Sequence, residues 1–168
     1  GFCFIAGPQR RMEASLNAIR TLDYGLASRV CEAVFDEISE DGVDSYLPDV
    51  VNEFWITLIE GDELIGLYRL HQVSAITYQI HAMILPEHRK QYAKQSGKII
   101  LDWCLKNIVF KKLIAEIPKK YENVYRFTKS MGFKDEGVNR LCFLKGGIEW
   151  DAYRLGQTKQ EIEKWLQH

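Results

Sequence analysis

Hydrophobic and polar positions recur with two different periods along the chain, and the changes of period divide it into strands and helices. The clearest block covers residues 76–109. Residues 76–85 form a mostly apolar run of strand length, whereas small and apolar residues recur every three or four positions from Ala93 to Ile108. The second spacing places those residues on one helix face. The block predicts a central strand over 76–85, a basic elbow over 86–91 and a long amphipathic helix after it.

Turn and cap residues complete the pattern. Asp23 is placed to cap the first helix, and Thr158 with Glu161 forms a capping box for the last one. Gly132 stands where a helix end requires a left-handed backbone. The other predicted elements, in chain order, are a strand over 16–22, a helix over about 24–41, a short helix or turn-rich connection over 44–52, strands over 54–59, 64–70 and 112–117, a helix over 122–131, a hairpin of strands 141–145 and 148–155, and a final short helix.

These elements predict an α/β (α+β) fold built on one mixed sheet. The strands over 54–59, 64–70 and 76–85 follow one another closely, as does the last pair, which is typical of an antiparallel meander. A long helix separates strand 76–85 from strand 112–117, and such a crossover joins parallel strands with a right-handed connection. The sheet is therefore expected to be mostly antiparallel, with one parallel pair.

Composition narrows the class of protein. A chain of 168 residues that is 46% hydrophobic supports a single domain over 12–168, and residues 1–11, which precede Met12, are interpreted as a leader or disordered N-terminus. The formal net charge of −1 gives no reason to expect nucleic acid or an acidic membrane as partner, and no apolar stretch is long enough to span a bilayer. The four scattered cysteines, interpreted as reduced core residues of a cytosolic protein rather than metal ligands, are Cys3, Cys31, Cys104 and Cys142.

Positive charge gathers at the start of the long helix, on His88, Arg89, Lys90 and Lys94. The first turn of a helix leaves backbone N–H groups without partners, and an anion fits there. Cations at that end are unfavourable by roughly a few tenths of a kcal/mol each. The cluster therefore predicts contact with a phosphate, and a solvated helix start is the alternative.

Three stretches resemble the GNAT superfamily of acyl-CoA-dependent N-acyltransferases. Residues 83–93, which read MILPEHRKQYA, are similar to the main acetyl-CoA motif of that family. Residues 124–133 are similar to its second helix, which ends in Gly-Phe, and residues 147–153 to its closing strand. The resemblance runs from about Leu16 to the end. The run from Ile117 to Lys134 is also similar to GNAT-like proteins of tailed bacteriophages.

The resemblance implies a fold and a co-substrate. The fold would be a mostly antiparallel central sheet with flanking helices, whose central parallel pair is splayed. The pantetheine arm of acetyl-CoA would lie in that opening and its pyrophosphate at the long helix, while an amine attacks the thioester; no metal is involved. The residues that the resemblance assigns to acetyl-CoA are Met83, Ile84, Leu85, Arg89, Lys90, Gln91, Tyr92, Ala93, Lys94, Asn123 and Phe127.

The chain departs from the family pattern at two places. The family loop carries glycines that let phosphate approach the backbone, but here residues 89–92 contain none and the first glycine is Gly97. Many members have an Asn that opens the second helix and a Tyr within it that serves as general acid. Counting back from Phe133 places Tyr121 and Thr128 at those positions.

Three side chains are candidate catalytic groups. His81, on the central strand, can serve as the base that deprotonates an amine, and its alternative is a hydrogen-bonded strand histidine. Glu116, on the neighbouring strand, is a second candidate base, with an outward-facing carboxylate as the alternative. Tyr121 can donate a proton to the leaving thiolate, or it serves packing alone.

Two functions remain open from the sequence. The first is an N-acyltransferase that moves an acetyl group from acetyl-CoA to an amine of unknown identity. The second is a catalytically degenerate GNAT fold that acts as a binding or structural protein, within a larger assembly such as a bacteriophage particle. The expected location is cytoplasmic, in the host cytoplasm or in the virion for a phage-encoded protein. The acceptor cannot be read, because acceptor contacts come from variable loops.

Overall fold

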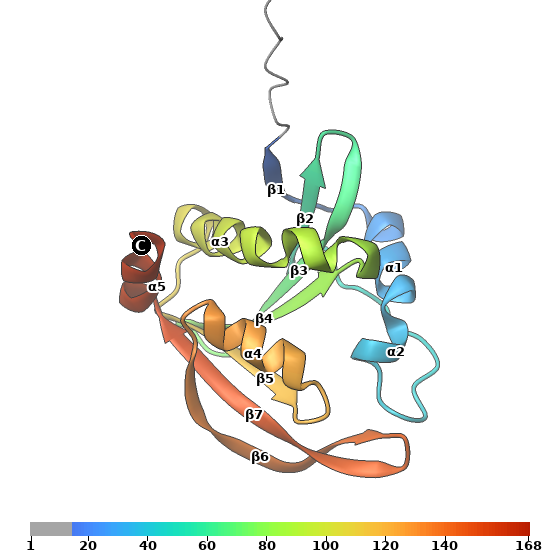
Figure 1. Cartoon of the computed structure of the whole chain (residues 1–168). Coiled ribbons are helices and arrows are strands. Elements are labelled where there is room, and N and C mark those ends of the chain that lie inside the picture. The colour runs from blue at the N-terminus through green and yellow to red at the C-terminus, as the bar shows by residue number, and fades with distance from the viewer. Residues whose placement is uncertain (1–14) are drawn as a thin grey trace, which may run out of the picture.

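The structure is a computed structural model that describes residues 15–168. The predicted leader and Cys3 lie outside the described residues. Seven strands form one sheet in the order β1-β2-β3-β4-β5-β7-β6, and five α-helices flank it (Figure 1). The elements are β1 (Leu16–Arg20), α1 (Tyr24–Ala33), α2 (Phe35–Ile38), β2 (Phe54–Glu60), β3 (Glu63–Gln72), β4 (Thr77–Ile84), η1 (Pro86–His88), α3 (Arg89–Asn107), β5 (Lys112–Pro118), α4 (Glu122–Ser130), β6 (Lys134–Lys145), β7 (Ile148–Thr158) and α5 (Lys159–Leu166).

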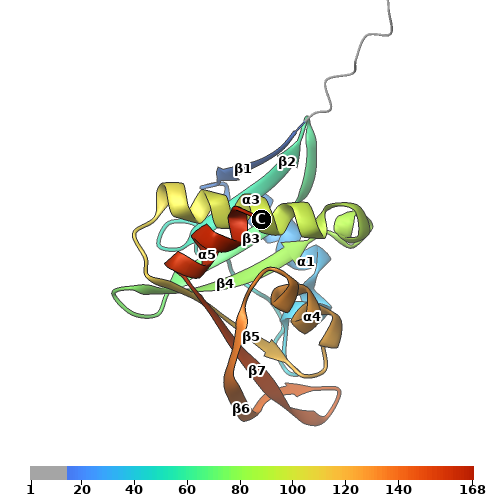
Figure 2. The same cartoon turned by 60° about the vertical axis from the view of Figure 1, so that its left-hand side comes forward.

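Helices cover both faces of the sheet, and each face has its own hydrophobic core. The larger core packs residues of α3, such as Ile100, and Ile162 of α5 against Leu113 of β5 and its neighbours. The smaller core packs α1, through Val30, against Trp55 and other strand residues that point the opposite way. Figure 2 shows α3 and α5 lying across the same face of the sheet. Alternation along the strands divides the apolar residues between the two cores.

All sheet contacts are antiparallel except the one between β4 and β5. These two strands run parallel, but the paired residues are only Thr77–Gln79 with Lys112–Ile114. Beyond Gln79 the strands separate, as Figure 1 shows. Ala82 is exposed although it lies in the central strand of the sheet, between the buried Ile80 and Ile84. The predicted splayed parallel pair at the centre of the sheet is confirmed.

The backbone of the separated half of β4 faces the gap at every second residue. The Leu85 N–H donates to the Ile65 carbonyl at 3.0 Å, and Ile84 stands opposite Gly66. In an antiparallel ladder this marks Ile84 as a residue of a non-hydrogen-bonded pair, so that its own N–H and C=O point away from β3. Ile80 and Ala82 share that orientation, since the period is two. The pairing of Gln79 with Ile114 engages the Ile80 N–H on β5, so the Ile80 carbonyl and both polar backbone groups of Ala82 point to the side where β5 has diverged.

The local signals at the ends of helices are confirmed. The Asp23 side chain accepts a hydrogen bond from the Leu26 N–H at 3.1 Å. The capping box of Thr158 and Glu161 is present in both directions. Gly132 has φ of 95°, in the left-handed region, and a Cβ there would lie 2.5 Å from the Gln157 amide nitrogen. These caps fix where α1 and α5 begin and where the chain leaves α4.

The prediction of a basic elbow over residues 86–91, before the start of the long helix, is wrong. Pro86–His88 form a 3-10 turn that continues directly into α3, which begins at Arg89. Pro86 opens this turn because its fixed φ suits a first helical position, and residues 87–96 contain no glycine that would interrupt the helix start. The basic residues therefore lie within the first turns of a helix and not before it.

Other boundaries also differ from those expected. The predicted helix over about 24–41 is divided at Val34 into α1 and α2 and ends at Ile38. Residues 44–52 contain no helix, so the turn-rich alternative holds. β6 begins at Lys134 rather than at 141, and its pairing with β7 is interrupted by shifts of register between Asp135 and Gly137 and between Asn139 and Phe143. Such bulges break the alternation of side chains, which explains why the pattern predicted only the last part of this strand.

No helix among residues 15–168 is both long and apolar enough to cross a membrane. In the same part of the chain, no group of three or more His, Cys, Asp and Glu side chains is arranged to hold a metal ion. Cys31 and Cys104 are buried free thiols, as expected of core residues, and Cys142 is a half-buried free thiol.

Candidate functional site

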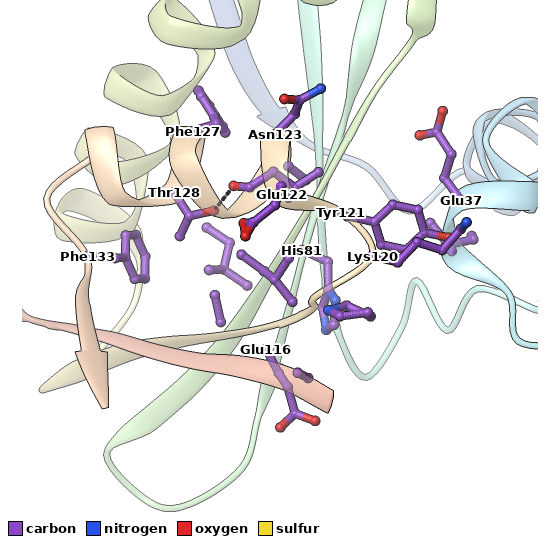
Figure 3. A pocket seen from close by; sticks show the side chains of 18 of the residues that line it. Glu37, His81, Glu116, Lys120, Tyr121, Glu122, Asn123, Phe127, Thr128 and Phe133 are labelled. Atoms are coloured by element: carbon purple, nitrogen blue, oxygen red, sulfur yellow. Dashed lines mark hydrogen bonds between the residues drawn. The ribbon is translucent and has the colours of Figure 1, made fainter. Parts of the chain in front are cut away.

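A pocket of about 640 Å³ opens where β4 and β5 separate (Figure 3). Its floor includes Ile80, Ala82 and Ala115 of these strands. One side is formed by α4, and the other by α2 and the part of β6 around Cys142. The pocket thus has walls from both layers of helices, and the gap in the sheet connects them. All three candidate catalytic residues, His81, Tyr121 and Glu116, contribute to its lining.

His81 lies in the pocket wall and is paired with a second histidine. Its Nε2 lies 3.2 Å from the Nε2 of His71, and the two rings stack with a centroid distance of 5.3 Å. Burial, followed by the positive charge of Arg69, lowers the pKa of His81 to about 3. His81 is therefore neutral at physiological pH. A neutral imidazole can accept a hydrogen bond from an amine. With its pKa lowered this far, however, it is a weak base and does not readily take the proton itself.

Tyr121 is the residue that precedes α4, and its hydroxyl is buried without a hydrogen-bond partner among the described residues. Its ring meets Phe143 of β6 edge to face, with centroids 6.2 Å apart. Burial raises the pKa of Tyr121, and the carboxylates of Glu37 and Asp36 add to this effect. The phenol therefore stays protonated, and its O–H is available as a donor. An unpartnered buried hydroxyl in a pocket is costly to stability, and a ligand can satisfy it.

Glu116 is held by the hairpin of β6 and β7. Its carboxylate accepts a hydrogen bond from the Asn139 side-chain amide at 3.0 Å and contacts the Cys142 thiol at 3.7 Å, while the Arg154 Nε lies 3.6 Å away. In Figure 3 the carboxylate points away from the other labelled side chains. This placement matches the outward-facing alternative, since three partners already occupy the carboxylate oxygens.

Arg89 lies at the first position of α3 and lines the pocket. Its Nε donates to the Ile84 carbonyl at 3.0 Å, and its two terminal nitrogens donate to the Glu37 carboxylate at 2.7 and 2.5 Å. The guanidinium therefore joins the open end of β4, the start of α3 and the short helix α2. The amides of His88 and Arg89 already donate, to the carbonyls of Leu85 and Pro86 respectively.

The other residues predicted to contact acetyl-CoA divide into three groups. Asn123 and Phe127 of α4 line the pocket. Met83, Ile84, Tyr92 and Ala93 pack into the protein as buried or half-buried groups, Leu85 lies half-buried just after β4, and the Tyr92 hydroxyl donates to Glu60 at the far end of β2. The exposed residues on the first turns of α3 are Lys90, Gln91 and Lys94.

Two features of the site were not predicted from the sequence. Ala82 has the position of a core residue on β4, and only the divergence of β5 exposes it. Glu37 is 52 residues before Arg89 in the chain, so that no local pattern connects them. Thr128, at the position where the family often has its general acid, donates its hydroxyl to the Val124 carbonyl at 2.8 Å and is not free to act.

The chain is similar to proteins that are named acetyltransferases and to one phage protein. It is 27% identical over 144 residues to the uncharacterized N-acetyltransferase YnaD of Bacillus subtilis (strain 168), covering 84% of this chain and 85% of the relative. It is 28% identical over 119 residues to the protein p31 of Acyrthosiphon pisum secondary endosymbiont phage 1, covering 69% and 76% of the two chains.

Solved structures with a similar fold include the spermidine/spermine N-acetyltransferase SpeG of Vibrio cholerae. A mutant form of SpeG superposes with a TM-score of 0.75 at 16% identity, covering 89% of this chain and 96% of the other. Its complex with CoA and spermine gives a TM-score of 0.72 at 17% identity, with coverage of 89% and 97%. These superpositions and the sheet confirm the predicted GNAT-like fold. Over residues 31–167 the chain matches the family described as "Protein of unknown function (DUF2824)", and it belongs to that family.

Proposed function

We propose that the protein is an acyl-CoA-dependent N-acyltransferase that moves an acetyl group from acetyl-CoA to an amine. The observation that carries this proposal is the opening between β4 and β5, where the strand backbone faces a pocket that reaches both layers of helices. The C=O group of Ile80 and the N–H and C=O groups of Ala82 face this opening and can bond an amide-containing arm as a missing strand would. Acetyl-CoA supplies such an arm, and the CoA complex of the structural neighbour supports its use here.

The proposed chemistry needs few groups. The amine nitrogen attacks the thioester carbonyl, so that a C–N bond forms and the C–S bond breaks. His81 accepts a hydrogen bond from the attacking amine and orients its lone pair toward the carbonyl. Tyr121 gives its proton to the departing thiolate, the amine loses one proton to solvent, and the phenolate regains a proton from solvent because its pKa is raised. Glu116, whose oxygens are already engaged, positions the β6–β7 hairpin in the pocket wall.

Calorimetric titration with CoA and acetyl-CoA tests the proposal. Saturable binding of both is expected, together with loss of binding in Ala82→Trp, which fills the gap with an indole. Production of free CoA in the presence of a panel of amines, beginning with spermine and spermidine, then identifies the acceptor. A flat titration at millimolar CoA would contradict the proposal.

A binding or structural role without catalysis is the second candidate. Two observations favour it: Glu37 already neutralises Arg89 at the helix start, and the phage protein p31 is among the relatives. The assay for free CoA separates the candidates, because a protein with a binding or structural role alone would release no CoA from acetyl-CoA with any amine. Its stable recovery with phage particles, with no turnover on any amine, would support this role.

A further inference from the structure

Three N–H groups of the Arg89 guanidinium are engaged, and its main partner comes from outside the helix. Two parallel N–H···O bonds connect its terminal nitrogens to the two oxygens of Glu37. This fork is the geometry in which arginine also binds a phosphate. Glu37 is thus an internal anion, placed at the helix start where the basic residues Lys90 and Lys94 also lie.

Glu37 belongs to a short segment that is fixed at its other end. The Asp41 carboxylate accepts hydrogen bonds from the backbone N–H groups of Gly146 and Gly147 at 3.0 and 2.8 Å. The Lys145 Nζ donates to the Ser39 carbonyl at 2.9 Å. We call residues 37–41 the strap. It runs from the start of α3 to the turn between β6 and β7, and Glu37 and Ile38 within it line the pocket.

The two ends of the strap differ in what holds them. The end at 39–41 is held by backbone and side-chain bonds to one hairpin. At the other end the backbone of Glu37 belongs to α2, and its side chain is held by a single ion pair. Both side chains of that pair are partly exposed, 39% for Arg89 and 46% for Glu37. A partly exposed ion pair is weak and is easily exchanged for another anion. Glu37 is therefore the end that a ligand can release.

We propose that Glu37 acts as a stand-in for the phosphate of acyl-CoA, which displaces it from Arg89 and thereby frees its carboxylate to receive the ammonium group of the acceptor. This inference rests on the proposed function. The released carboxylate stays on the pocket wall near Tyr121, whose pKa already responds to its charge. Acyl-CoA then binds first and the amine second, and Glu37 selects acceptors that carry a positive charge apart from the neutral nitrogen that attacks.

The test compares Glu37→Gln with a matched control, Glu87→Gln. Glu87 is an exposed carboxylate in η1, beside the same helix start, and no hydrogen bond or ion pair involves its side chain within residues 15–168. Calorimetry with CoA is expected to show binding about two- to fivefold tighter in Glu37→Gln than in the wild type. The reason is that the CoA phosphate no longer competes with the Glu37 carboxylate for Arg89. Glu87→Gln is expected to change the affinity by less than about 1.5-fold, since it alters charge without freeing Arg89.

The double variant with Arg89→Gln isolates the contact. In an Arg89→Gln background, adding Glu37→Gln is expected to leave CoA affinity unchanged. Once an accepted amine is known, kcat/KM for that amine falls in Glu37→Gln although CoA binds more tightly, and a merely structural role would not produce these opposite changes. Circular dichroism and thermal melting verify that each variant is folded.

The outcomes are distinct. Equal CoA affinity in wild type and Glu37→Gln overturns the inference while the proposed function stands, and so does an equal gain in Glu87→Gln. Absence of CoA binding in the wild type and in every variant overturns the proposed function, and the inference with it. Tighter binding in Glu37→Gln alone, abolished by Arg89→Gln, supports the inference.

Discussion

The two halves of β4 show how one strand serves two purposes. At Thr77–Gln79 it is bonded on both sides, to β3 and to β5, and this half joins the two parts of the sheet. From His81 to Ile84 it is bonded to β3 alone, and its other edge faces the pocket. The apolar pattern is similar in both halves. What differs is the course of β5, which turns away after Ile114 and follows β7.

This difference separates stability from binding. The closed half packs side chains such as Leu113 at zero exposure, so that changes there affect the folded state. The open half leaves backbone groups and the exposed Ala82 without a neighbouring strand, so that changes there affect what can enter. A variant in either half should therefore alter one property and spare the other.

The largest expected effect is on the closed half. Leu113→Ala removes a fully buried side chain where β5 pairs with β4, and we expect a loss of about 2–5 kcal/mol in the free energy of unfolding. Urea denaturation measures it. Ile114→Ala, on the opposite and half-buried face, should lose less. The comparison fails if the loss in Leu113→Ala is below about 1 kcal/mol, or if the folded variant no longer binds CoA.

In the open half, Ala82→Trp should abolish binding without unfolding the protein. The indole would fill the space beside β4, and we expect CoA affinity to fall by more than about 100-fold, while the urea midpoint moves little because Ala82 is exposed. Ala75→Trp is the matched control, since Ala75 is an exposed alanine beyond the closed end. Tight CoA binding by Ala82→Trp would show that the ligand does not use the gap.

The next effect concerns proton donation. Tyr121→Phe removes a hydroxyl that has no partner among the described residues, so neither stability nor CoA affinity should fall. The value of kcat should fall by about 10- to 100-fold, as for loss of a general acid. Steady-state kinetics with an accepted amine measures it. Tyr153→Phe, whose hydroxyl bonds Glu122, is the control, and equal losses in both variants would remove Tyr121 from the chemistry.

The smallest effect is a dependence of stability on pH. The pKa of His81 is depressed from 6.5 to about 3 in the folded state, so the unfolded chain binds a proton that the folded chain does not. The contribution of His81 to the free energy of unfolding is fully present above pH 6.5. It is lost as the pH falls toward 3, by up to about 1.4 kcal/mol per pH unit. When the pH is lowered from 6.5 to 5, the free energy of unfolding should fall in both proteins. The fall should be smaller in His81→Gln than in the wild type, by up to about 2 kcal/mol. Urea denaturation at both pH values measures the difference. An equal fall in the free energy of unfolding of the two proteins would contradict the prediction.

Much of the fold could be predicted because its signals are local. Helix caps such as Asp23 and Thr158 depend on residues within a few positions, and so does the alternation along each strand. The structure contains the capped helices and the strands that these signals predict. The start of α3 was misplaced because Pro86 can either break a helix or open one, and only the geometry of the preceding strand decides between them.

Less of the site could be predicted from the sequence, because its contacts join residues far apart in the chain. The resemblance led to His81 and Tyr121, which do line the pocket, but their roles stay predictions. Ala82 lies on the face of β4 that packs the core, and its exposure depends on where β5 diverges. The ion pair of Glu37 with Arg89 joins segments whose order in space is set by the whole sheet.

The most direct test is amide hydrogen exchange by NMR with and without saturating CoA. We expect the amides of Ala82 and Ile84, which face the gap, to become protected, while those of Thr77–Gln79 keep the same exchange rates. Unchanged exchange at Ala82 and Ile84 in the presence of bound CoA would contradict the account, because the ligand would then lie elsewhere.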